Sequence, residues 1–358
     1  MTFLASRRHT GMSDRRTDGR GPERVLLEAL QAGDQDAFGV LAERYRRELQ
    51  VHCYRMLGSL EDAEDTVQEA LLRAWRKRGL FEGRSTFRAW LYGITTNACL
   101  DVLERRSRRV LPSALAQPAD PFEPPPPPVE APWLDPYPDR LLDEIVDDAP
   151  QPHERIAARE TVELVFLAAI QYLPPRQRAV LLLRDVLGWS ARETSVMLEM
   201  SVIAGNSALQ RARAALKEHL PERRLDWPRN TDAQASELQL LEQYMDAWKR
   251  TDVGALVALL KEDVRLVMPP TPAWYAGRQA VLDFLSHWPM SPTFPRHIHV
   301  PTRANRQPAF AVFARPRETG VLEPLGVEVL RIEDGLIAEI TIFLKPQLVP
   351  AFIAAPPP

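Results

Sequence analysis

A run of consecutive prolines, Pro124 to Pro128, divides this 358-residue chain and limits what its middle can become. Proline lacks a backbone N–H and fixes φ, so neither a helix interior nor a central strand crosses such a run. Further prolines and acids such as Asp120 and Glu123 surround it. We therefore predict an extended linker over residues 111–153, which buries no core and separates folded domains on either side.

Composition narrows the class of protein. The chain is 45% hydrophobic and 26% charged, as ordinary soluble proteins are, and its length favours two or three domains. A net charge of −3 argues against nucleic-acid binding by the whole surface, so any such binding is local or supported by a partner. The two cysteines, Cys53 and Cys99, lie in apolar helical patterns and form no disulfide framework, which suits a reducing cytoplasm. No apolar run reaches the ~18–20 residues of a membrane span.

Hydrophobic periodicity divides the chain into blocks. Residues 1–22 are basic and polar without a hydrophobic centre, so we expect disorder rather than a secretory signal. Helical spacing covers 23–110 and returns over 154–222. Residues 233–348 begin with a helical run and then change to a period of two, which predicts an α+β domain. The expected strands are Arg265–Met268, Ala309–Ala314, Gly326–Ile332 and Ile337–Leu344.

The helix predicted over Asp62–Trp75 has two distinct sides. Ser59 supplies an N-cap, and small and apolar residues at helical spacing form a core stripe. The opposite side carries a polar set: Asp62, Asp65, Gln68 and Glu69. From the pattern alone this is a solvated face whose acids favour the positive end of the helix.

The next stretch, Glu82–Arg109, mixes aromatic, amide and basic residues. Phe87 and Trp90 fall on an apolar stripe, while Asn97 lies among polar positions. The stretch ends in a basic cluster: Arg105, Arg106, Arg108 and Arg109. Such a mixture holds single-stranded nucleic acid, because cations track phosphates while rings and amides meet unstacked bases. The alternative is a core stripe with a solvated basic end.

Gly188–Leu216 predicts two short helices joined by a tight turn, a helix-turn-helix that enters a DNA major groove. Ser201 is a natural N-cap for the second helix, in which Val202 is expected to be buried. Four residues are expected to face the groove: Asn206, Ser207, Gln210 and Arg211. Asn and Gln pair with adenine edges and Arg with guanine, and Arg213 is suited to phosphate. Gly205 inside this helix costs ~1 kcal/mol.

These segments together resemble a known family. DAED-x-x-Q-E from Asp62, then TFRAWLY-x-I-x-x-N from Thr86, then the helix-turn-helix are similar to bacterial sigma factors of the sigma-70 family, extracytoplasmic-function class. The resemblance implies a region 2 helical bundle over 23–110 and a region 4 helix-turn-helix over 154–222. It covers roughly half of the chain.

The resemblance also implies roles for single residues. Asp62, Asp65, Gln68 and Glu69 would dock on the clamp helices of core RNA polymerase, and the flap would be a second contact. Promoter DNA would be bound at two places. The −10 element would meet Arg84, Ser85, Phe87, Asn97, Arg105 and Arg106, and the −35 element Arg192, Asn206, Ser207, Gln210, Arg211 and Arg213. The linker would thread the RNA exit path of the polymerase, or would serve as a plain spacer.

The third block resembles SnoaL-like domains, curved sheets wrapped by helices around a cone-shaped cavity. LLEQYMDAWKR from Leu240 and the W-Y-x-G-R run from Trp274 carry the likeness. Candidate cavity residues are Tyr244, Trp274, His297 and Glu328. A pocket acid with a raised pKa would move a proton next to a carbonyl. The alternatives are ligand sensing and contact with the sigma core or polymerase. His297 and His299 share a strand face but lack a third ligand, so we expect neither a metal nor a cofactor.

We therefore expect a multidomain protein: two all-α sigma domains, a region 2 bundle and a region 4 helix-turn-helix, followed by an α+β SnoaL-like cone. Its expected function is transcription initiation in the cytoplasm as an alternative sigma factor, not catalysis. Two other functions stay open. One is a ligand-sensing helix-turn-helix repressor, which would predict paired half-sites. The other is an isomerase- or cyclase-like enzyme with a DNA-binding segment.

Overall fold

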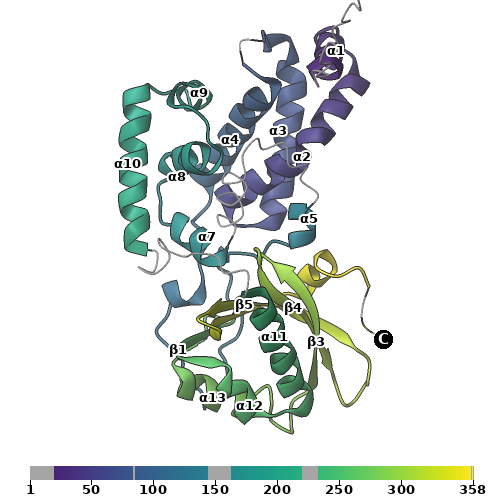
Figure 1. Ribbon diagram of the computed structural model, residues 1–358, viewed down its shortest axis with the longest axis vertical. Coiled ribbons are helices and arrows are strands. Elements are labelled where there is room, and N and C mark those ends of the chain that lie inside the picture. Colours follow the sequence, from purple (N-terminus) through teal and green to yellow (C-terminus); the bar gives the residue numbers. More distant parts are fainter. Residues whose placement is uncertain (1–19, 84, 144–162, 220–232, 356, 358) are drawn as a thin grey trace, which may run out of the picture.

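The computed structural model describes residues 20–83, 85–143, 163–219, 233–355 and 357. Helices fill the upper part of the molecule and a mixed sheet fills the lower part, with α5 (Asp139–Asp143) and α7 (Leu164–Ile170) between them (Figure 1). Residues 1–19 of the start that was expected to be disordered over 1–22, and the junction at 154, lie outside the described residues, whereas 20–22 belong to α1.

The first unit, here called the N-terminal bundle, consists of α1 to α4. Their bounds are α1 (Arg20–Gln31), α2 (Gln35–Leu57), α3 (Leu60–Lys77) and α4 (Phe87–Arg105), with the short η1 (Arg78–Leu80) after α3. The predicted cap is present, since Ser59 accepts a hydrogen bond from the Asp62 backbone N–H. Helices α2, α3 and α4 pack on one another around side chains such as Leu49, Val67 and Leu91. The expected core stripe of α3 is confirmed.

The helix-turn-helix unit follows the linker and comprises four α-helices and one π-helical turn. They are α7, α8 (Pro175–Leu181), η3 (Leu182–Val186), α9 (Ala191–Met197) and α10 (Val202–His219). Ser190 caps α9 in a full capping box with Glu193, and Ser201 accepts from the Ala204 N–H at the start of α10. The predicted turn at Glu199 is confirmed by its left-handed φ of 49°.

The sheet domain begins with α11 (Ala233–Arg250) and α12 (Val253–Ala258) and includes α13 (Arg278–His287). Its strands are β1 (Leu260–Val267), β2 (Trp274–Ala276), β3 (Arg296–Ala304), β4 (Gln307–Arg315), β5 (Glu323–Glu333) and β6 (Leu336–Phe343), and η5 (Pro346–Ala351) ends it. The order in the sheet is β2-β1-β6-β5-β4-β3, with β1 parallel to β6 and the other neighbours antiparallel. The expected α+β domain and its four expected strands are confirmed.

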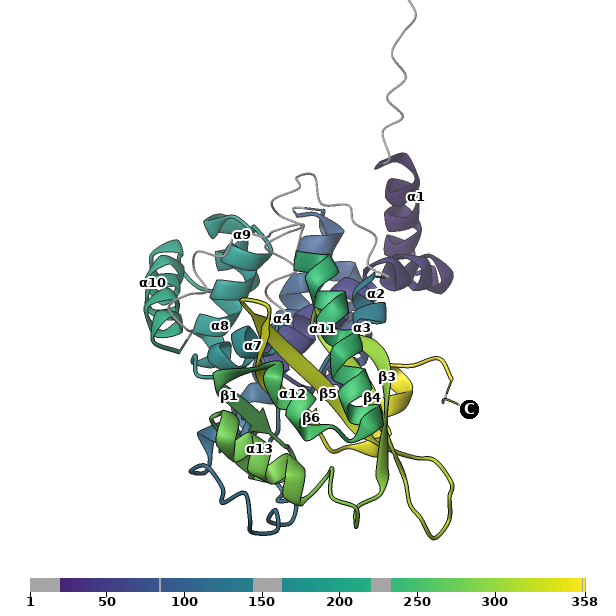
Figure 2. The same ribbon diagram turned by 60° about the horizontal axis from the view of Figure 1, so that its bottom comes forward.

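The sheet has two buried faces. Its own helices α11, α12 and α13 lie over one face (Figure 2), against Phe310, Val312 and Leu330. The alternate residues of β4, Ala309, Ala311 and Phe313, join a hydrophobic core that continues into both helical units. Because side chains alternate along a strand, β4 is buried on both sides.

The linker departs from its prediction. Pro124 to Pro128 is largely exposed, as expected, but Leu134, Tyr137 and Leu141 are buried, so the expectation that the linker buries no core was wrong. The Asp135 N–H donates to the carbonyl of Gly58 at 3.0 Å, and the Asp135 carboxylate binds Lys345 of the sheet domain. Gly58 has a φ of 70°, and a side chain there would meet Leu134 at 2.7 Å. The linker end therefore packs between the bundle and the sheet domain.

Candidate nucleic-acid interface

The polar face of α3 is only partly exposed. Asp65 and Gln68 are exposed, and Glu69 is half-buried and paired with Arg73 at 2.8 Å. Asp62 was expected on the same open face, but it is 8% exposed and pairs with Arg106 and Arg109. The expectation fails for Asp62 because the basic end of α4 crosses the first turn of α3.

Two pockets of the bundle share Gln68. One of about 370 Å³ lies between α2 and α3 and is lined mainly by apolar side chains, with Phe38, Leu71, Leu72 and Trp75 among them. The other, about 190 Å³, is lined by Arg46, Arg47, Gln50, Glu64, Val67 and Gln68. Leu72 is 51% exposed beside the first pocket, so α3 offers an apolar groove next to acidic and amide side chains.

The expected −10 residues separate into a core residue and surface residues. Phe87 is 1% exposed and packs against the rings of Phe81 and Trp90, as its place on the apolar stripe predicted, so in this arrangement its ring is not open to the −10 element that the resemblance assigned to it. Ser85 and Arg105 are exposed, whereas Arg84 lies outside the described residues. Arg106, expected on DNA phosphate, is instead paired with Asp62.

The helix-turn-helix unit covers the polar side of α4. Asn97 donates from Nδ2 to the Met197 carbonyl of α9 at 3.2 Å. The ring of Trp189 lies 5.7 Å from the ring of Tyr92, and the Arg88 guanidinium lies 5.1 Å from the Trp189 ring centre. We call the α4 residues Arg88, Tyr92, Gly93 and Asn97 the covered face.

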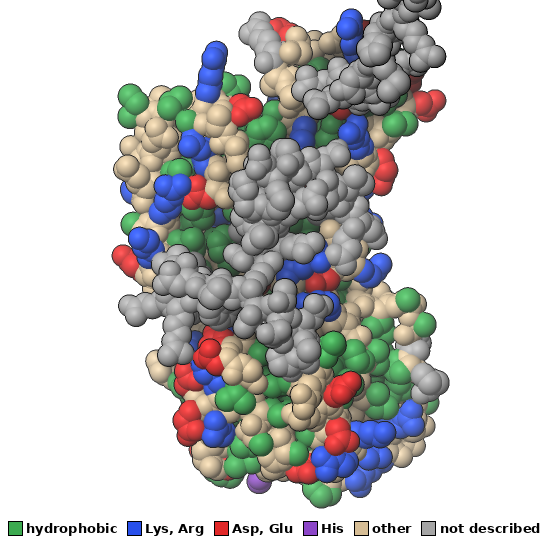
Figure 3. Space-filling view, viewed as in Figure 1, with side chains coloured by type: hydrophobic (Ala, Val, Ile, Leu, Met, Phe, Trp, Pro, Cys, Tyr) green, Lys and Arg blue, Asp and Glu red, His purple; other side chains and the backbone are tan. Residues whose placement is uncertain are grey.

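The second helix of the helix-turn-helix is open to solvent. Asn206, Gln210 and Arg211 are exposed, Ser207 is half-buried, and Arg192 on α9 is exposed. Figure 3 shows Lys and Arg side chains along this side of the molecule. We call this the open face of α10.

Two expectations about α10 were wrong. Arg213 forms a double hydrogen bond with Asp185, at 2.8 and 2.7 Å, instead of standing clear for phosphate. This hydrogen bond raises the pKa of Arg213. Val202 was expected to be buried but is 40% exposed.

In the sheet domain two of the four candidate cavity residues meet. Tyr244 donates to the Glu328 carboxylate at 2.6 Å, and both are fully buried. Burial, followed by the nearby Glu328 charge, raises the pKa of Tyr244. His299 lies 3.8 Å from Glu328, and the strand periodicity that links it to His297 is the signal that identifies it.

The other two candidates lie elsewhere. The ring centres of His297 and Trp248 are 5.7 Å apart with the rings tilted, and burial, then His299, lowers the pKa of His297 to about 4. Trp274 donates from Nε1 to the Ala116 carbonyl of the linker, so it holds the linker and does not join the Tyr244–Glu328 pair. Within the described residues, no cluster of three metal-ligating side chains occurs.

The hairpin between β3 and β4 joins all the units. Its tip residues Asn305 and Arg306 have φ of 57° and 59°, as a two-residue hairpin turn requires. The Asn305 amide donates to the Tyr54 hydroxyl of α2 at 2.8 Å and accepts from the Tyr137 N–H of the linker at 2.8 Å. Gln307 accepts from the Leu164 N–H of α7 at 3.1 Å. We call this contact the hairpin joint.

Within the described ranges, no helix combines the length and apolar character that crossing a bilayer requires.

Comparison with known proteins follows the three units. Residues 41–109 match Sigma-70 region 2, residues 163–216 match Sigma-70, region 4, and residues 241–340 match a SnoaL-like domain. The ECF RNA polymerase sigma factor SigG of Mycobacterium tuberculosis is 42% identical over 320 residues, which cover 88% of this chain and 83% of SigG. The ECF RNA polymerase sigma-E factor of Escherichia coli is 32% identical over 206 residues, 57% of this chain and 95% of that protein.

A solved structure supports the fold across all three units. The crystal structure of the Mycobacterium tuberculosis extracytoplasmic-function sigma factor SigJ matches with a TM-score of 0.53 at 19% identity, over 87% of this chain and 98% of that one. The repressor and enzyme alternatives are not favoured. This chain belongs to the sigma-70 family of RNA polymerase sigma factors, in the extracytoplasmic-function class, and carries a C-terminal SnoaL-like domain.

Proposed function

We propose that this sigma factor docks on core RNA polymerase through the outer side of α3. Asp65, Gln68 and Glu69 supply polar contacts, and the neighbouring groove at Leu72 and Trp75 supplies apolar area. Asp62 acts indirectly in this proposal, because its ion pairs fix the end of α4 against α3. The flap of the polymerase remains the expected partner of the helix-turn-helix unit.

Promoter contacts divide between the two helical units in this proposal. The open face of α10, with Asn206, Ser207, Gln210 and Arg211, binds base edges of the −35 element, and Arg192 binds backbone phosphate. Asn97, Ser85 and Arg84 bind the −10 strand, and Arg105 follows its phosphates. These contacts rest on the family membership and on the exposure of α10.

The arrangement described above is, we propose, a closed form of the protein. Asn97 uses its amide on Met197, and α9 lies where a −10 strand would have to lie. Binding of that strand therefore requires the helix-turn-helix unit to leave α4. Polymerase and DNA would favour the open form, and any contact made only in the closed form opposes them.

The hairpin joint is the observation that carries this proposal. It joins the sheet domain to α2 and the linker through Asn305 and to α7 through Gln307, and in this proposal it stabilises the closed form. The Asn305 side chain makes two buried hydrogen bonds there, each contributing ~0.5–1.5 kcal/mol. We propose that the SnoaL-like domain regulates initiation by this contact. A small-molecule ligand at Tyr244 and Glu328 is the second candidate, favoured by the buried hydrogen bond between them.

Asn305→Gly tests the joint, because glycine keeps the positive φ and removes the side chain that carries both hydrogen bonds. The full chain and the variant are compared in transcription from a cognate promoter with core polymerase. We expect a several-fold rise in product at subsaturating sigma concentration. Asp334→Gly is the matched control, since Asp334 also has a positive φ, 53°, in an exposed turn and its ion pair with Lys261 stays within the sheet domain. Equal product from Asn305→Gly and the unaltered chain would overturn the regulatory proposal.

A further inference from the structure

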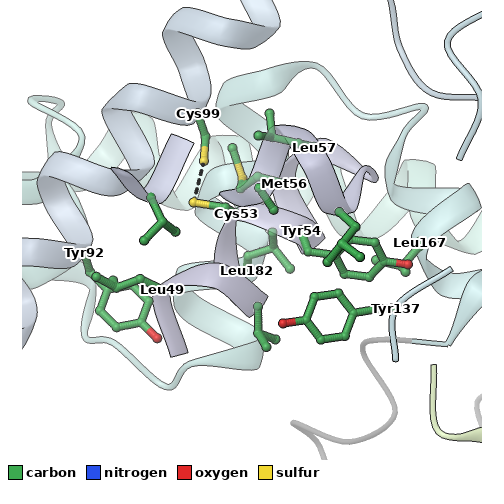
Figure 4. Packing of buried hydrophobic residues seen from close by; sticks show 14 of the residues in the cluster. Leu49, Cys53, Tyr54, Met56, Leu57, Tyr92, Cys99, Tyr137, Leu167 and Leu182 are labelled. Atoms are coloured by element: carbon green, nitrogen blue, oxygen red, sulfur yellow. Dashed lines mark hydrogen bonds between the residues drawn. The ribbon is translucent and has the colours of Figure 1, made fainter. Parts of the chain in front are cut away.

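The two cysteines of the chain lie side by side in the core. Cys53 on α2 and Cys99 on α4 are 46 positions apart, both are fully buried, and their sulfurs are 3.5 Å apart. Figure 4 shows the two side chains pointing toward one another. The chain has no other cysteine, so each thiol has a single intramolecular partner.

The helix-turn-helix unit closes over this pair. Helix α8 contacts both α2 and α4, and Leu182, directly after α8, belongs to the same core cluster as both cysteines. Arg178 of α8 donates to the Met56 carbonyl of α2 and to the Gln171 side chain. Burial lowers the pKa of Arg178 to about 10, while Cys99 acts in the opposite direction. Helix α8 therefore lies against both helices that carry the thiols.

Burial also makes the thiols unreactive in this arrangement. It is the main cause that raises the pKa of Cys53, and the thiolate is the form that reacts with oxidants. Movement of α8, the helix that carries Arg178, would let solvent take its place and would remove this protection. The reactivity of the pair is thus coupled to the position of the helix-turn-helix unit.

We propose that Cys53 and Cys99 form a reversible dithiol–disulfide pair, whose oxidation by a hydroperoxide is gated by the helix-turn-helix unit. One thiolate attacks the peroxide oxygen, becomes a sulfenic acid and releases water or an alcohol. The second thiol attacks the sulfenic sulfur, the S–S bond forms, and a second water leaves. Two thiols lose two electrons and two protons, and one peroxide bond is reduced. A thiol reductant reverses the step by exchange.

The two sulfurs lie near disulfide-bonding distance but are not bonded. A disulfide needs ~2.05 Å between sulfurs, so roughly 1.5 Å of approach joins α2 to α4. Buried cysteines also serve as small apolar residues, and plain packing predicts no such bond. Treatment with an oxidant distinguishes a redox pair from plain packing, because only a redox pair forms the bond.

The full-length protein is treated with hydrogen peroxide, quenched with iodoacetamide under denaturing conditions and weighed intact. We expect loss of two hydrogens and no alkylation in the oxidised fraction, and two alkyl groups after reduction. Cys53→Ser and Cys99→Ser are matched controls that cannot lose two hydrogens. Addition of oxygen to one cysteine without loss of two hydrogens would overturn the proposed pair. So would two free thiols in the folded protein under conditions in which a urea-unfolded sample forms the disulfide.

Trp189→Ala tests the gate, because it removes the ring that rests on Tyr92 and Arg88. We expect the disulfide to form at least several-fold faster than in the unaltered chain, with circular dichroism unchanged. Trp288→Ala in the sheet domain is the matched substitution and should leave the rate unchanged. Equal rates in both variants would refute the gate and leave the disulfide to its own test. The gate rests on the closed form proposed above, but its readout needs neither polymerase nor promoter, so the two proposals fail separately.

Discussion

The two surfaces that we propose as contacts for promoter DNA differ in their exposure to solvent. The open face of α10 presents Asn206, Gln210 and Arg211 to solvent, while the covered face of α4 is closed by α9 and Trp189. A duplex can therefore approach the first face without rearrangement, whereas a melted strand needs a change of domain position first. The difference teaches that recognition and melting can be separated within one chain.

The largest expected effect concerns the open face. Arg211→Ala should lose up to ~3 kcal/mol of binding to the cognate −35 sequence, because a bidentate arginine–guanine contact is worth ~1–3 kcal/mol. Titration of holoenzyme on cognate and altered promoters measures it. Arg192→Ala is the comparison and should weaken both promoters alike. A uniform loss from Arg211→Ala would show a phosphate contact and break the assignment of α10.

We expect low pH to lower the stability of the N-terminal bundle beneath α4. His52 lies under α4, with Nε2 2.9 Å from the Thr96 hydroxyl, and burial, followed by Arg55 and Arg88, lowers its pKa from 6.5 to about 3. The folded bundle holds this histidine neutral, so the unfolded chain binds the extra proton below pH 6.5 and stability falls as pH drops from there toward 3. At pH 5 this amounts to about 2 kcal/mol. Denaturant unfolding at pH 7 and 5 checks it, and His52→Gln should show a smaller pH dependence.

We expect a smaller free-energy contribution from Trp189, the ring that covers α4. Trp189→Ala removes one aromatic contact and one cation–π contact, together ~1–2 kcal/mol. Amide hydrogens of α4 should then exchange about tenfold faster with deuterium, while those of α10 keep their rates. Unchanged exchange in α4 would mean that the cover does not depend on Trp189, and the closed form would need another explanation.

The smallest effect is expected at Arg213. Its ion pair with Asp185 is exposed, and such pairs contribute ~0.2–1 kcal/mol. Arg213→Ala should lower the thermal midpoint slightly and leave promoter preference unchanged, which differential scanning fluorimetry and promoter titration measure. A sequence-dependent loss of binding would show that Arg213 contacts DNA bases together with the residues of the open face.

Local signals in the sequence predicted the elements well, because they depend on neighbouring residues. Ser59 and Ser201 cap helices as their hydroxyls suggested, and the period-two runs around Phe310 and Leu330 became strands. The helix-turn-helix followed from a short stretch of chain. In each case the physical cause lies within a few positions of the effect.

Contacts between distant residues were beyond such reasoning. The burial of Asp62 depends on Arg106 and Arg109, and Asn97 is occupied by a carbonyl 100 positions away. The linker prediction failed for the same reason, since the Tyr137 ring packs on Tyr54 of α2 and the Tyr137 N–H donates to Asn305, 168 positions later. Residue type predicted which groups prefer partners, but not which partners the fold supplies.

The double-sided burial of β4 has a practical consequence for anyone who shortens this protein. Removing the sheet domain would take its side chains out of the core that it shares with both helical units, and would uncover Tyr54, which contacts Asn305. Freshly exposed patches of this kind promote self-association. A truncated sigma factor would therefore combine two changes, loss of the hairpin joint and a newly exposed apolar surface. Single-residue substitutions such as Asn305→Gly separate the two effects.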